Sequence, residues 1–172
     1  MFWYSARATV KIFDLPLKRL SLHYVDVFDH HLTPFHDTDP GKIWCSNITH
    51  IAWGTLTESL CRLFTYFPNL THIMVGAWNT TTLVGEVLKQ YPSVQVLIWL
   101  LADFRSDNET FVIEPNEEKD SGFDDYRVVT INGHLFKDWI RGAQGEEDMW
   151  DIAERKVKER KEQMGMHLLS RW

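Results

Sequence analysis

Acidic and imidazole side chains that can hold a metal ion gather in one short segment. Asp29, His30 and His31 are followed by His36 and Asp37. Carboxylates and neutral imidazoles are ligands of metal-dependent phosphoesterases, in which the ion activates a water molecule. The segment therefore suggests a small metal-dependent hydrolase on a parallel sheet. A solvated loop is the interpretation we favour, because such hydrolases draw ligands from several strand ends and no matching cluster follows another expected strand.

Two other histidines, His50 and His72, occupy the same position of a repeated pattern. On neighbouring parallel strands they would stand about 5 Å apart. Such a pair could bind a metal ion or respond to pH, because neutral imidazole is a ligand and titrates near neutrality. The alternative, which we favour, is a surface residue that the repeat encodes. No catalytic residue and no cofactor is predicted.

The repeated pattern is an apolar residue, two of any kind, an apolar residue, one of any kind, and an apolar residue. Its five copies are Leu17-Leu20-Leu22, Ile48-Ile51-Trp53, Leu70-Ile73-Val75, Val94-Leu97-Trp99 and, more weakly, Tyr126-Val129-Ile131. Their starts differ by 31, 22, 24 and 32 residues. Leucine-rich repeats span roughly 20–29 residues, and loops absorb the excess. We therefore predict an α/β fold, a short leucine-rich-repeat-like solenoid with a parallel sheet.

The segments between the strands should return the chain on the convex side. A capping box at residues 55–58 opens an apolar stripe that reaches Phe67 and stops at Pro68. A second stripe runs from Leu83 to Tyr91 and stops at Pro92. Both predict helices, whereas residues 24–40 and the acid-rich residues 103–125 suggest loops.

We predict a single domain over residues 1–172. Residues 1–16 are its N-terminal edge segment, 17–133 its five repeats, and 134–172 a C-terminal helical cap and tail. Glu146, Glu147 and Asp148 suit the start of the capping helix, after a break at residues 142–145. The competing architecture is a small doubly wound α/β domain, for which no Gly-rich phosphate loop follows any expected strand.

Composition and charge exclude several classes of partner. The formal charge of −6 argues against nucleic acid. No apolar run approaches the ~20 residues of a membrane span, and residues 1–7 lack a secretory signal. Cys45 and Cys61 are too few for a disulfide framework. We therefore expect an intracellular protein, cytoplasmic or nuclear, that neither binds nucleic acid nor crosses a membrane.

Four short segments of the sequence carry a family resemblance. Residues 67–73 (FPNLTHI) and 91–97 (YPSVQVL), with residues 138–143 (DWIRGA) and 148–150 (DMW), resemble uncharacterised F-box-like leucine-rich repeat proteins of mushroom-forming (basidiomycete) fungi. The resemblance spans roughly residues 67–162 and implies a solenoid that holds a target protein. Only 16 residues precede the first repeat, whereas an F-box needs about 40, so binding of a Skp-type adaptor is not expected.

The function we predict is a non-catalytic protein-protein interaction module, a truncated or degenerate F-box-type substrate-recognition solenoid. Its partner protein is not identified by the sequence. Side chains between the inward-pointing ones would form the binding surface on the concave side. The candidates are Arg19, Ser21, His23, His50, His72, Met74, Val96, Ile98, Leu100, Val128 and Thr130. Because Val96, Ile98 and Leu100 are apolar, we expect a segment of the chain itself, rather than a partner, to cover them.

Overall fold

The computed structural model describes residues 18–22, 38–54, 64–76, 81–101, 123–133 and 135–169. The chain divides into two compact units, residues 1–94 and 95–172. The described residues form an α/β fold with five strands, and the strands that pair within each unit are parallel. This confirms the predicted class and the parallel pairing, and the leucine-rich solenoid stays a prediction. Within the described ranges, no helix has the length and apolarity needed to cross a membrane.

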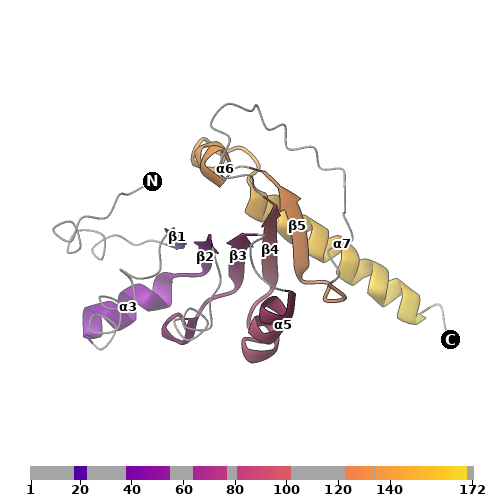
Figure 1. Cartoon of the computed structure of the whole chain (residues 1–172), viewed down its shortest axis with the longest axis horizontal. Helices are drawn as coiled ribbons and strands as arrows, with labels where there is room; N and C mark the ends of the chain where they lie inside the picture. Colours follow the sequence, from indigo (N-terminus) through magenta and orange to yellow (C-terminus); the bar gives the residue numbers. More distant parts are fainter. Residues whose placement is uncertain are drawn as a thin grey trace. The chain divides into compact units, whose positions relative to one another are not determined.

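The first unit contains three parallel strands, β1 (Arg19–Leu22), β2 (His50–Trp53) and β3 (His72–Gly76), side by side in that order (Figure 1). The predicted pairing of His50 with His72 is confirmed by the register. Both faces of β2 and β3 are buried, since Ile51 and Ile73 on one face and Ala52 and Met74 on the other are all 2% exposed or less. The strands therefore differ from those of a sheet with one solvated face.

The helix α3 (Asp39–Asn47) precedes β2 and was not predicted. Thr38 is its N-cap, and the Thr38 hydroxyl accepts a hydrogen bond from the Gly41 N–H at 3.1 Å. Asp39 lies in the first turn, where a negative charge suits the helix dipole. Pro40 has no backbone N–H, which costs nothing in the first turn because N–H groups there have no acceptor within the helix. The prediction of a loop through residue 40 was therefore wrong at its end.

A tight turn recurs before three strands, β2 and β3 of the first unit and the strand that begins at Val96. The N–H groups of Ile48, Leu70 and Val94 each donate to the carbonyl three residues earlier, at 3.2, 3.0 and 3.1 Å. All three side chains are 2% exposed or less. The first apolar residue of the sequence pattern thus anchors the turn into the core.

As α3 precedes the turn at Ile48, helical segments also precede the turns at Leu70 and Val94. The predicted helix over Leu83 to Tyr91 is confirmed as α5 (Thr81–Gln90), which buries Val84, Val87 and Leu88. Of the helix predicted before Pro68, the structure describes only the end, the 3-10 turn η1 (Phe64–Tyr66). Residues 55–63 lie outside the described part.

The second unit pairs β4 (Val96–Leu101) with β5 (Val128–Asn132), and α7 (Met149–Leu169) packs against both strands (Figure 1). Leu97 is the partner of Val128, so these two side chains share a face of the pair. The sequence pattern had placed Val128 on the face of Val96 and Ile98, which was wrong by one residue. Val128 and Val129 are both apolar, so the alternation at β5 allows either register.

A sharp corner joins α6 (Leu135–Ala143) to α7. Gly145 has φ of 79°, a left-handed conformation that suits glycine. Its N–H donates to the Gly142 carbonyl at 3.1 Å, and the Glu146 N–H donates to the Arg141 carbonyl at 3.0 Å. This is a Schellman motif, and it ends α6 inside the predicted break.

Buried carboxylates brace the start of α7. Asp148 Oδ1 accepts from the N–H groups of Trp150 and Asp151 at 2.9 and 3.1 Å, and Asp151 Oδ2 accepts from the Asp148 N–H at 3.0 Å. This reciprocal pair is a capping box. Asp138 of α6 accepts from the Met149 N–H at 2.8 Å, and Asp138 and Asp148 are 3% and 4% exposed. Asp138 and Asp148, which belong to the segments that carry the family resemblance, therefore have a structural role in this chain.

Candidate functional site

The most regular polar feature of the first unit is a Thr-His pair that enters two adjacent strands. The N–H groups of Thr49 and His50 both donate to the Lys18 carbonyl, at 2.9 and 3.1 Å. The N–H groups of Thr71 and His72 both donate to the Thr49 carbonyl, at 3.0 Å each. The same local geometry thus places both imidazoles at equivalent positions of neighbouring strands. We call these four residues the Thr-His ladder.

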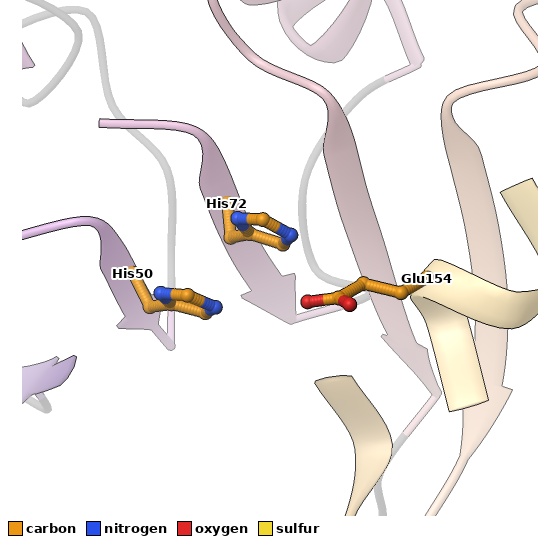
Figure 2. Close-up of side chains that lie close together, drawn as sticks. All are labelled: His50, His72 and Glu154. Carbon is orange, nitrogen blue, oxygen red and sulfur yellow. The ribbon is translucent and has the colours of Figure 1, made fainter. Parts of the chain in front are cut away.

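The two imidazole rings of the ladder stack on each other (Figure 2). The ring centroids of His50 and His72 are 4.1 Å apart and the ring planes differ by 8°. The hydroxyl of the preceding threonine lies 2.7 Å from Nδ1 of each ring, Thr49 for His50 and Thr71 for His72. Glu154, also drawn in Figure 2, is an exposed residue of α7 in the second unit. Each ring of the His50–His72 pair is thus held at its Nδ1 atom by the hydroxyl group of the threonine before it.

The environment of His72 favours neutral imidazole. His72 is only 7% exposed, and burial, with a smaller effect of the Arg19 charge, lowers the pKa of His72 to about 4. Arg19 is the partner of His50 on β1 and is itself partly exposed. His50 is also partly exposed. The row Arg19–His50–His72 therefore runs across three strands, with solvent access at the β1 and β2 positions.

Most other candidates for the binding surface are buried. Met74, Val96, Ile98, Leu100 and Val128 are 3% exposed or less. A buried side chain cannot contact a partner in this conformation. Thr130 is partly exposed, as Arg19 and His50 are; Ser21 lies in β1, and His23 lies outside the described residues.

The candidate metal ligands of the hydrolase hypothesis, His30, His31, His36 and Asp37, also lie outside the described residues. That hypothesis stays a prediction, and no geometry in the described part of the chain bears on it.

The apolar pattern of the sequence did not predict a role for the two threonines of the ladder. A signal for them is present, because Thr-His occurs twice at a spacing of 22 residues, at 49–50 and 71–72. The apolar pattern alone gives no reason to inspect the residue before each strand. A buried or half-buried histidine needs a hydrogen-bond partner, and the hydroxyl of the threonine before each histidine is the nearest one along the chain.

The comparisons with known proteins give no identification. No family model, no curated protein and no solved structure matches this chain. The resemblance to F-box-like leucine-rich repeat proteins therefore stays a prediction, and the ladder and its row are interpreted from their own chemistry.

Proposed function

We propose that this chain is a non-catalytic protein-binding module, and that the partly exposed end of the row Arg19–His50–His72, at Arg19 and His50, lies at its recognition surface. The observation that supports this function is the repetition of one local unit on adjacent strands. Repeat proteins bind partners through side chains that occupy the same position of successive repeats. The Thr-His ladder repeats both the side chains and their hydrogen bonds. A module of this kind also fits a truncated or degenerate F-box-type solenoid.

The exposed side chain at the end of the row indicates which chemical groups a partner should present. A guanidinium group forms paired hydrogen bonds with a carboxylate, so Arg19 is the residue of the row that would contact an acidic partner. Arg19 is the Cα partner of His50 and has partial solvent access, whereas the Nε2 atom of His50 is buried. The partner we propose is therefore a protein segment that presents Asp or Glu side chains. Binding would not require the Skp-type adaptor.

The test compares one charge reversal on the row with a matched reversal elsewhere in the same unit. Arg19→Glu changes the row, whereas Lys89→Glu changes an exposed residue of α5. Circular dichroism first shows that both variants fold as wild type does. The three proteins then serve as bait for proteins of the source cell, and binding is measured again with the captured protein in purified form. We expect Arg19→Glu alone to lose a partner that wild type and Lys89→Glu retain. Equal binding by all three proteins would refute the proposal.

The buried β4 residues are unsuitable for this test. Ile98 and Leu100 are 0% and 1% exposed, so aspartate at either position would unfold the second unit before any surface was tested.

A further inference from the structure

The ladder has the features of a metal-ligand pair, independently of any protein partner. Two imidazoles face each other from paired positions of adjacent strands, and each offers a ring nitrogen within 4.8 Å of the other's. Figure 2 shows that the outer nitrogens of both rings point to the same side. Backbone pairing fixes the spacing of the two residues, so the arrangement does not depend on a loop.

The contacts of the threonines are compatible with the histidine tautomer that binds metal ions through Nε2. The Thr49 hydroxyl donates to the Lys18 carbonyl at 3.3 Å, and the Thr71 hydroxyl donates to the Thr49 carbonyl at 3.4 Å. The same oxygen can then accept a hydrogen bond from the ring Nδ1–H across the 2.7 Å contact, in the tautomer that carries the proton on Nδ1. Neutral rings then carry their lone pair on Nε2. Metal-binding histidines show the same arrangement, in which the second ring nitrogen donates to an oxygen.

We propose that His50 and His72 together bind one divalent transition-metal ion, of the Cu²⁺, Ni²⁺ or Zn²⁺ class, through their Nε2 atoms. Imidazole suits these ions, whereas Mg²⁺ and Ca²⁺ prefer oxygen ligands. Two nitrogens bound to one tetrahedral ion at about 2.0–2.1 Å stand roughly 3.3 Å apart. Binding therefore tilts the two rings toward each other and replaces the stack, with the strands in place.

Arg19 provides an internal check on this proposal. Its charge acts on His72, where it opposes a second positive charge. The same repulsion must weaken the binding of a cation between the rings. Removal of this charge in Arg19→Gln is therefore expected to raise the metal affinity, an effect that loss of a structural residue would not produce.

The experiment titrates the full chain with Zn²⁺ and with Cu²⁺. Zn²⁺ binding is followed by calorimetry, and Cu²⁺ is followed by the paramagnetic broadening of histidine ring signals in NMR spectra. We expect one equivalent of either ion to bind, with broadening at His50 and His72, and no response to Mg²⁺. His50→Ala should abolish this binding. Thr71→Val, which removes the hydroxyl at Nδ1, should lower the affinity by about 10–100-fold.

Two control variants separate this site from other histidines of the chain. His167→Ala tests a histidine in α7, and a triple replacement of His30, His31 and His36 by alanine tests the Asp/His-rich segment. Both should bind Zn²⁺ as wild type does. The proposal is overturned if wild type binds neither ion, if His50→Ala binds as wild type does, or if the triple variant alone loses the ion. Because His50 is partly exposed, its replacement keeps the test usable even if His72→Ala fails to fold.

Discussion

Gly142 in α6 lies so close to Asp148 that a side chain at this position would displace the cap of α7. A Cβ atom at residue 142 would stand 2.7 Å from Asp148 Oδ2 and 3.2 Å from Asp148 Cβ. Asp148 cannot move away freely, since it is 4% exposed and accepts two backbone hydrogen bonds from the first turn of α7. Gly142→Ala should therefore be destabilising, although alanine is the better helix former.

The magnitude follows from two opposing effects. Alanine in place of glycine within a helix gains up to about 1 kcal/mol. Displacement of Asp148 loses an N-cap, which costs about 0.5–2 kcal/mol where water replaces the carboxylate and about 1–3 kcal/mol where the buried N–H groups are left unsatisfied. We expect a net loss of about 1–2 kcal/mol in the free energy of unfolding. Gly85→Ala in α5 is the matched control, because no atom lies within 4 Å of its Cβ position, and it should gain about 1 kcal/mol.

Urea unfolding followed by circular dichroism measures these differences, and a double-mutant cycle isolates the contact. In an Asp148→Ala background the obstructing carboxylate is gone, so Gly142→Ala should become stabilising, as Gly85→Ala is. The reasoning is refuted if Gly142→Ala stabilises the otherwise wild-type chain, because Asp148 would then yield at no cost. Equal effects of Gly142→Ala in both backgrounds would also contradict it.

Three further predictions concern stability. The pKa of His72 is about 4 in the folded chain against 6.5 for an ordinary histidine, so the unfolded chain takes up its proton first as the pH falls. The contribution of neutral His72 to the free energy of unfolding is therefore complete above pH 6.5 and falls by about 3 kcal/mol toward pH 4. In His72→Gln the urea midpoint should fall less over this pH range than it does in wild type. Gly145→Ala places a side chain at φ of 79° and should cost about 1–2 kcal/mol in the same assay, whereas unchanged stability would contradict the Schellman geometry. Ile98→Asp puts a carboxyl group at a 0% exposed position, so the cooperative thermal transition of the second unit should disappear, and a retained transition would show that Ile98 can reach solvent.

The parts of the fold that the sequence predicted are those with strong local signals. The stripe from Leu83 to Tyr91, ended by Pro92, gave α5, and the acids before Met149 gave the start of α7. The pairing of His50 with His72 followed from equal positions in two well-spaced repeats. Each of these depends on a period or a cap that only one structure satisfies.

The errors arose where local signals were ambiguous. Thr38, Asp39 and Pro40 are turn formers, and they are also good residues for a helix start, which is the role they have in α3. The register of β5 could not be chosen from Val128 and Val129, since either valine can face the core. Burial of both strand faces depends on which elements cover them, and the sequence contains no direct signal of that.

The candidate site was predicted in part. The positions of His50 and His72 were expected, but their hydrogen bonds to Thr49 and Thr71 were not, because a hydroxyl one residue before a strand leaves no trace in an apolar pattern. The low exposure of His72 was also unexpected, since the repeat had suggested a surface residue.

The order of elements in the second unit has a consequence for synthesis on the ribosome. β4 is made first, yet its partner β5 and the helix α7 that packs on it come later in the chain. At roughly 5–20 residues per second, translation from Leu101 to Leu169 takes about 3–14 s. During this time Ile98 and Leu100 lack these covering elements. The nascent chain should therefore present a chaperone-binding segment at β4 that the finished protein no longer exposes.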